Sequence, residues 1–444
     1  MESEASTLRV PALTSGSGLS HPLRKFLQIL VLIWAATLIS CWFQRNILHW
    51  PASNWYPFFL PEFRFNDFSS WRERFQHLHK PDFFDVPGLP YNYPTFAGLI
   101  LDGFYSLGRF GLGVFLTFCV VVFSAAGLML GRGMTRRGLD KGQTVLFLGT
   151  ALLLSYPFWF LLDRANIEMI NWFFVAAGVA AYWKRRWYTA ATFLGLAVSF
   201  KIFPFVFLGL LFSARKYRAL LWGLVVCAVT TFASNWIFGP TASLAAAGLS
   251  KGLQWYKLHY ILEIHPAETG FDHSLFELIK LATFPGIAAE HAHYLPILNW
   301  YMGIAATVGV VLFFRKICRL PRANQILALT VASLLFPPIS ADYRLIHLYI
   351  PWGALVLISI PMRDRQQLRG LAFSFACLAF LMAPESFFAI HGVKFAGQLK
   401  AIVLFVLFLV SITCPFEEQA YEGEVEQAAG SHAADRHSLH SATV

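Results

Sequence analysis

The stretch Ser199-Phe200-Lys201-Ile202-Phe203-Pro204 places a lysine and a proline in the middle of an apolar run, and basic residues flank that run on both sides. A second apolar run with basic flanks carries a similar interruption, Phe336-Pro337-Pro338-Ile339-Ser340-Ala341-Asp342-Tyr343-Arg344. Short loops rich in Lys and Arg stay in the cytoplasm, so each run is predicted to enter the membrane and return, with its tip near the outer face. Ionisable residues at membrane depth are costly unless they line a polar site, so these tips hold candidate functional residues.

The composition predicts a polytopic membrane protein, because 57% of the 444 residues are hydrophobic and only 14% are charged. A soluble protein carries about 25% charged residues. The net charge of +10 does not indicate nucleic-acid binding, since the basic residues lie in short loops between apolar runs. We therefore expect the lipid bilayer and no nucleic acid as a partner. The predicted fold is all-α, with about 10 to 12 transmembrane or half-membrane helices.

Three parts are expected along the chain: a cytoplasmic segment over residues 1–24, a transmembrane domain over 25–416, and a polar, disordered cytoplasmic tail over 417–444. Two large extracytoplasmic loops are predicted within the transmembrane domain, at about residues 44–96 and 239–295. Both termini would then lie in the cytoplasm.

A charged turn separates two predicted spans, which cover about residues 144–162 and 170–183. The turn reads Asp163-Arg164-Ala165-Asn166-Ile167-Glu168. Helix capping and an Asp–Arg pair at the membrane surface explain Asp163 adequately. Asn166 and Glu168 are harder to explain as caps, because Glu168 opens a span that should be apolar.

Asp67 is a candidate general base, because it lies between aromatic residues in the first of the two large loops. A carboxylate there could take a proton from a hydroxyl group, a role worth roughly 10²–10⁴ in rate. The alternative is a loop carboxylate paired with Arg64, Arg72 or Arg74.

The two interrupted tips suit an anionic group. Pro204 favours the first turn of a helix, and a half-helix starting there would direct its positive end toward Lys201 and a bound phosphate. The alternative is that Lys201 only reaches the outer interface. In the second tip, Arg344 could hold a phosphate that His347, three residues on, would donate to or orient. The alternative there is an Asp342–Arg344 pair that caps a helix.

In this order, the motifs resemble the polyprenol-phosphate-sugar-dependent glycosyltransferases of the GT-C superfamily, and in particular the bacterial membrane enzymes of glycosyltransferase family 87. The resemblance covers roughly residues 25–415. Members of the family often have a small-Gly-Asn sequence where this chain has Ala165-Asn166, and a second proline where it has Thr95. The motifs that carry the resemblance are Asn66-Asp67-Phe68, Tyr91-Asn92-Tyr93-Pro94, Ser155-Tyr156-Pro157, the turn 163–168, Phe200-Lys201-Ile202-Phe203-Pro204 and Phe336-Pro337-Pro338-Ile339-Ser340 with His347.

The resemblance implies a hexosyl- or pentosyltransferase, with mannose as the first choice, that moves a sugar from a polyprenyl-phosphate donor to a glycolipid or glycan acceptor. It further implies inversion at the anomeric carbon, no metal or other cofactor, and an active site on the outer side of a bacterial inner membrane. Asp67 is then the expected base, and Lys201 and Arg344 would offset the charge on the leaving phosphate. Residues expected to orient the substrates are His347, Tyr93 (by stacking on a sugar), Asp163, Arg164, Asn166 and Glu168.

Two other classes of protein stay open at this point. A transporter or flippase of a lipid-linked sugar would use the interrupted runs as discontinuous helices around a central site. It would tolerate loss of Asp67 better than loss of Lys201 or Arg344. A scaffold of an envelope assembly complex would tolerate the loss of either Asp67 or Lys201.

Overall fold

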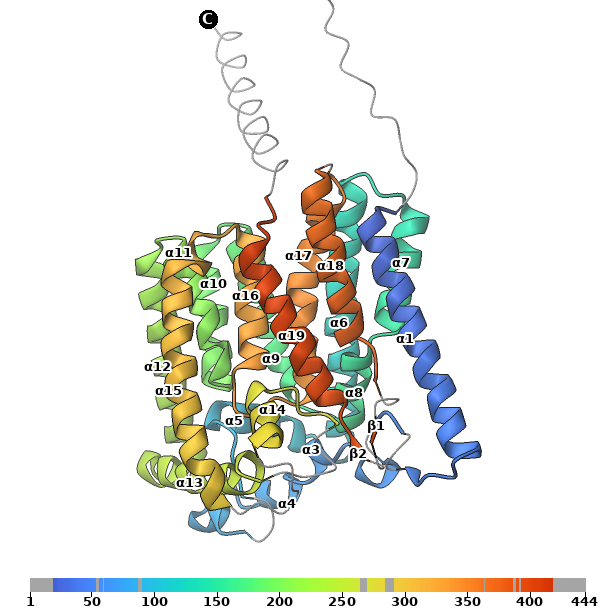
Figure 1. Ribbon diagram of the computed structural model, residues 1–444. Helices are drawn as coiled ribbons and strands as arrows, with labels where there is room; N and C mark the ends of the chain where they lie inside the picture. Colours follow the sequence, from blue (N-terminus) through green and yellow to red (C-terminus); the bar gives the residue numbers. More distant parts are fainter. Residues whose placement is uncertain are drawn as a thin grey trace, which may run out of the picture.

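The computed structural model describes residues 19–417 except 53–55, 59, 87–89, 264–269, 284–290, 363, 386–388 and 391–392. All of the predicted tail at 417–444 except its first residue, and most of the segment at 1–24, thus lie outside the described residues. The predicted all-α class is confirmed (Figure 1). Within the described ranges, strands are confined to a two-residue ladder of β1 (Ala389–Ile390) and β2 (Val393–Lys394).

Five helices in the described part of the chain are long and apolar enough to cross a membrane. In all of them but α19, most of the apolar side chains face outward: Leu32 and Leu128, for example, are 66% and 68% exposed. Exposure of so many large apolar residues would be a liability in water, and it marks a surface that contacts lipid. The chain is therefore a multi-pass membrane protein. The five helices are α1 (His21–Asn46), α6 (Gly111–Arg136), α12 (Tyr217–Phe238), α15 (His291–Arg315) and α19 (Ala396–Thr413).

The span predicted at residues 144–162 is broken into two helices, α7 (Lys141–Leu153) and α8 (Tyr156–Arg164), which meet at an angle of 44°. Ser155 caps α8, since its hydroxyl accepts from the Phe158 backbone N–H. Pro157 follows in the first turn, where a proline starts a helix and cannot continue the preceding one. The two helices together are long and apolar enough for the predicted span, and Ser155 and Pro157 break it by ending one helix and beginning the next.

Both predicted interrupted hairpins are present. The first consists of α10 (Trp187–Phe200), the 3₁₀ helix η4 (Phe203–Phe207) and α11 (Leu208–Ser213), and Lys201 lies in the extended link. The second consists of α16 (Arg322–Leu335), the 3₁₀ helix η7 (Asp342–Leu348) and α17 (Tyr349–Ser359). A helix begins beside Lys201 with Pro204 in its first turn, as predicted, and its first five residues are 3₁₀ before α11 continues it.

The remaining helices complete the bundle and form a layer of short helices at one of its ends (Figure 1). The ends of α1 and α19 that adjoin the undescribed termini lie together at the opposite end. We call the layered end the loop-rich end. Its helices are η1 (Pro61–Phe63), α3 (Asn66–Ser69), α4 (Arg72–Phe75), η2 (Pro81–Phe84), α5 (Thr95–Tyr105), η3 (Gly108–Phe110), α13 (Ala242–Tyr256), the π-helix η5 (Lys257–Ile261) and α14 (Leu275–Thr283). The bundle also contains α9 (Glu168–Trp183), η6 (Ile317–Arg319) and α18 (Arg365–Leu381).

An aromatic core holds together the two segments that were predicted as large loops, at about residues 44–96 and 239–295. Tyr91 is 1% exposed and packs against Trp71, Phe75 and Phe238. Helix α13 of the second segment crosses this core closely at Gly252, where an added Cβ would lie 1.9 Å from the Tyr91 carbonyl oxygen. Only a residue without a side chain allows the two backbones to approach this far.

We therefore expect Gly252→Ala to lower the free energy of unfolding by about 1–3 kcal/mol, the usual cost of overpacking. The measurement is thermal unfolding of the detergent-purified protein. Gly303→Ala is the matched control, because an added Cβ in α15 meets nothing within 4 Å. If Gly252→Ala unfolds at the same temperature as the control, the close contact between α13 and the first loop segment does not exist.

Candidate functional site

The Asp67 carboxylate is held by the charged turn that follows α8. Arg164 donates to its Oδ1, and the Asn166 amide donates to its Oδ2 at 2.6 Å. The predicted pairing with Arg64, Arg72 or Arg74 was wrong. The side chains of Asp67 and Arg164 are each 15% exposed, so the carboxylate is fixed but still reachable.

Backbone geometry brings these three side chains together. Ala165 ends α8 in the left-handed conformation with φ of 48°, which turns the chain so that Arg164 and Asn166 face the same carboxylate. This is the position where the resemblance has glycine, the residue that adopts such a φ without strain. On the other side, the Phe65 N–H donates to the Asp163 carbonyl at 2.7 Å and fixes the start of α3 beside the turn.

Glu168 is the centre of a buried ionic cluster. Its carboxylate receives the Lys201 ammonium at 2.5 Å and His347 Nε2 at 2.8 Å, and the Asn171 amide also donates to it at 2.8 Å. Glu168 is fully buried, and its backbone N–H donates to the Asn166 Oδ1 at 2.9 Å. Asn166 thus joins the Asp67 group to the Glu168 group. The geometry favours a role for Glu168 in positioning Lys201 and His347 rather than in touching a substrate.

The two predicted cations come together from the tips of the two hairpins. Lys201 is 7% exposed and lies 5.4 Å from the Tyr93 ring centre and 5.6 Å from that of Tyr343. Because it is buried against Glu168, the interpretation of Lys201 as a residue that only reaches the interface was wrong. Arg344 lies 5.1 Å over the Phe203 ring and donates to the Ile339 carbonyl at 2.9 Å.

Charge in this cluster is not balanced. Arg164 pairs with Asp67, and Lys201 pairs with Glu168, but Arg344 makes no ion pair with any described residue. One positive charge is therefore in excess. Arg344 is only partly exposed, and a partly buried cation without a carboxylate partner is costly, so Arg344 is a candidate for binding an anion.

Tyr93 completes the wall of the site beside Asp67. Burial and the neighbouring Asp67 carboxylate raise the pKa of Tyr93 well above its ordinary value, so its phenol stays neutral. Its ring packs edge-on against Trp71 with centres 5.9 Å apart, and Lys201 lies over its face. Within the described ranges, no three His, Cys, Asp or Glu side chains gather as metal ligands.

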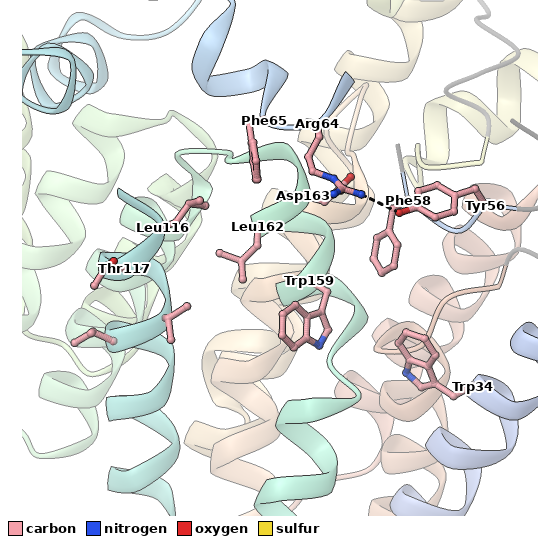
Figure 2. A pocket seen from close by; sticks show the side chains of 12 residues that line it. Trp34, Tyr56, Phe58, Arg64, Phe65, Leu116, Thr117, Trp159, Leu162 and Asp163 are labelled. Carbon is pink, nitrogen blue, oxygen red and sulfur yellow. Dashed lines mark hydrogen bonds and ion pairs between the residues drawn. The ribbon is translucent and has the colours of Figure 1, made fainter. Parts of the chain in front are cut away.

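Asp163 points away from these groups. Its carboxylate pairs with Arg64 at 3.1 Å (Figure 2). The structure thus brings together Asp67, Arg164, Asn166, Glu168, Lys201, Arg344, His347 and Tyr93, but not Asp163.

A comparison with known protein families decides the relationship. The model of glycosyltransferase family 87 matches residues 91–340, which is more than half of the chain. The chain belongs to glycosyltransferase family 87. The matched region includes Tyr93, the charged turn and Lys201, whereas Asp67, Arg344 and His347 lie outside it.

A curated relative is also similar to this family 87 chain. It is a polyprenol-phosphate-mannose-dependent α-(1-2)-phosphatidylinositol pentamannoside mannosyltransferase from Mycobacterium tuberculosis (strain CDC 1551 / Oshkosh), and it is 25% identical over 306 residues. The alignment covers 68% of this chain and 65% of the relative's length. No solved structure matches the chain.

A second buried network, missed in the sequence, supports the family 87 site. Asp342, at the start of η7, accepts from Lys400 at 2.5 Å, from the Tyr156 hydroxyl at 2.7 Å and from His273 at 3.2 Å. Lys400 also pairs with Glu385 at 2.9 Å, and all five side chains are nearly or fully buried. The predicted Asp342–Arg344 pair was wrong. A lysine and a glutamate in or beside the last apolar spans were the signals that could have indicated this network.

The network also ties the second loop segment to the hairpin tip. The His273 N–H donates to the Ser340 carbonyl at 2.9 Å, and the Ser340 N–H donates to Asp272 Oδ1 at 3.0 Å. Burial, together with the neighbouring Glu277 charge, raises the pKa of Asp272 to about 6. Helix η7, which carries Arg344 and His347, is thus fixed at its first residue from several sides.

We expect Lys400→Met to lower the free energy of unfolding by about 3–5 kcal/mol, because it leaves the Asp342 and Glu385 carboxylates buried without a cation. Lys251→Met is the matched control, since the Lys251–Asp85 pair is 70% and 67% exposed and such pairs contribute little. Thermal unfolding in detergent measures both variants. Equal stability of the two would show that the buried network does not hold η7.

Proposed function

We propose that this chain is a membrane glycosyltransferase that moves a sugar, with mannose as the first choice, from a polyprenyl-phosphate donor to a hydroxyl group of a glycolipid or glycan acceptor. Membership of family 87 supports the reaction class, and the relative's printed name supports the donor and a glycolipid acceptor. We place the reaction at the loop-rich end, on the outer side of a bacterial inner membrane. The basic loops between the apolar runs support that orientation.

The observation that carries the proposal is the positive charge in excess at Arg344, next to the Lys201–Glu168 pair. A sugar linked to a lipid through a phosphodiester carries one negative charge, which this excess would balance. When the sugar leaves, the freed phosphate gains a second negative charge, and Lys201 and Arg344 are already in place to stabilise it. Stabilising charge that develops during the reaction is usually the largest single contribution of a site to the rate.

The Asp67 carboxylate would take the proton. The acceptor oxygen forms a bond to the anomeric carbon, its proton passes to Asp67, and the bond between that carbon and the phosphate oxygen breaks with its electron pair on the phosphate. Each Asp67 oxygen accepts one hydrogen bond, from Arg164 or from Asn166, so lone pairs remain for the hydroxyl.

Direct displacement with inversion fits these residues better than a covalent intermediate. Glu168 is linked to Asp67 through Asn166 and is the next carboxylate in the cluster, but it is fully buried and accepts from Lys201, His347 and Asn171. It is therefore not available as a nucleophile. Asp67 as a single base, with the phosphate across the sugar from the incoming hydroxyl, requires no second carboxylate.

Asp67→Asn should reduce transfer by about 10²-fold or more, because the amide keeps the size of the side chain but cannot take the proton. The measurement is transfer of label from radioactive polyprenyl-phosphate sugars to endogenous lipids, in membranes that contain the wild type or the variant. Asp82→Asn is the matched control, since Asp82 is 58% exposed in the same loop.

Full activity of Asp67→Asn would remove Asp67 as the base. Absence of transfer from any donor, together with movement of the donor across proteoliposomes, would replace the transferase with a flippase.

Arg344→Gln should lower transfer by about 10²-fold and raise the KM for the donor, because it removes the unpaired cation. Its effect on stability should be small, since no ion pair is broken. Arg109→Gln is the matched control: Arg109 also lies over a phenylalanine ring, at 4.9 Å from Phe110, but on the exposed surface. A donor KM that equals that of the wild type would show that Arg344 does not bind the phosphate.

A further inference from the structure

A recess of about 800 Å³ opens on the lipid-facing surface of the protein, close to the loop-rich end (Figure 2). Helix α7 packs against both α1 and α6, and α8 lies between these two spans as the floor of the recess after the 44° bend. The broken span thus shapes the recess. Its apolar lining includes Trp34 of α1, Leu116 and Val121 of α6, and Trp159 and Leu162 of α8.

Polar groups gather at one end of the recess. Arg64 donates to Asp163 at 3.1 Å and to the Tyr56 hydroxyl at 3.2 Å, and its side chain is 43% exposed. The other walls are apolar side chains and Thr117. A recess with apolar walls and one polar end suits an amphiphile, whose hydrocarbon chains would lie along α6 and α8 and whose headgroup would lie at Arg64.

The polar end lies next to the proposed base. Asp163 and Arg164 are consecutive at the end of α8, and they pair with Arg64 in the recess and with Asp67 in the site. Arg64 and Asp67 are three residues apart in the chain, so their Cα atoms are separated by at most about 10 Å. The headgroup of a lipid in the recess would therefore arrive at Asp67.

The cations lie outside the recess. Helix η7, with Arg344 and His347, packs against α8, and none of its residues is among those that line the recess. Beside Lys201, the apolar side chains of Ile202 and Phe205 are 82% and 55% exposed and offer a separate surface for the chain of the donor. In a direct displacement the hydroxyl approaches opposite to the leaving phosphate, so a lipid that reaches Asp67 from the recess is on the acceptor's side.

We propose that the recess binds the hydrocarbon chains of the acceptor, which is therefore a membrane glycolipid, and that Arg64 and Tyr56 contact its headgroup. This inference rests on the proposed function for the assignment to the acceptor. The donor chain, bulk lipid and a partner helix are the other occupants that the experiments separate.

The first experiment fills the recess in the intact protein. Val121→Trp should raise the KM for the endogenous lipid that the wild type labels by about tenfold, the effect of displacing roughly two buried methylene groups. When the acyl chains of the same lipid have been removed by mild alkali, the variant and the wild type should transfer sugar to it equally well. The KM for the donor should also be the same for the two proteins. Val311→Trp is the matched control, because Val311 is 51% exposed on α15 and lies outside the recess.

A raised KM for the donor would assign the recess to the donor chain and overturn the proposal. Equal kinetics of the two variants would overturn it as well, since the recess would then hold only bulk lipid.

The second experiment does not depend on activity. Cells that express the protein are fed a fatty acid with a diazirine group, their membranes are irradiated, and the lipids crosslinked to α6 and α8 are identified by mass spectrometry. We expect glycolipid to be enriched at residues 116–121 and 159–163 relative to the surface of α15. The same proportion of bulk phospholipid at both surfaces, or crosslinks to a protein, would overturn the proposal.

The two experiments fail in distinguishable ways. If the transfer assay is silent but glycolipid is enriched in the recess, the lipid site stands and the transferase does not. If transfer occurs without enrichment or a change in acceptor KM, the transferase stands and the recess assignment is wrong.

Discussion

The buried carboxylate of Glu168 is the constraint on which the rest of the site depends. A fully buried carboxylate needs a cation and several hydrogen bonds, because its transfer from water is otherwise prohibitive. Here the donors come from two different hairpins: Lys201 from the link after α10, and His347 from η7. The same interaction therefore closes the two tips onto α9, and through Asn166 it sets the distance between the cations and Asp67.

The sequence was informative wherever a charge interrupted an apolar run. Lys201, Arg344 and Glu168 were identified because ionisable side chains at membrane depth are costly unless they line a functional site. The structure places the three side chains close together. Which groups pair was not predictable, since the partners are distant in the chain: Arg164 with Asp67, and Lys400 with Asp342. Sequence neighbours such as Arg64 were the obvious partners for Asp67, yet the turn at Ala165 directs Arg164 there instead.

The helix break at Ser155 shows a second limit on what the sequence can predict. The residues Ser155-Tyr156-Pro157 carried a cap and a helix-starting proline, but the run around them is apolar over the length of a full span, and hydropathy alone favours one helix. In the structure, the cap at Ser155 and the proline at Pro157 determine where the helices end and begin, and the average hydropathy of the run does not. As a consequence α8 contributes to both the recess and the charged cluster, because Asp163 pairs with Arg64 and the next residue, Arg164, pairs with Asp67.

The position of Lys400 in α19 also has a consequence for biogenesis. Asp342 and its neighbours are synthesised well before α19, and their balancing cation enters the membrane only when α19 is inserted. Until then the second hairpin tip holds a carboxylate without its ammonium group, a state that the translocation machinery or chaperones must tolerate. A nascent chain that stops before α19 therefore cannot form the ion pairs of Asp342 and Glu385 with Lys400.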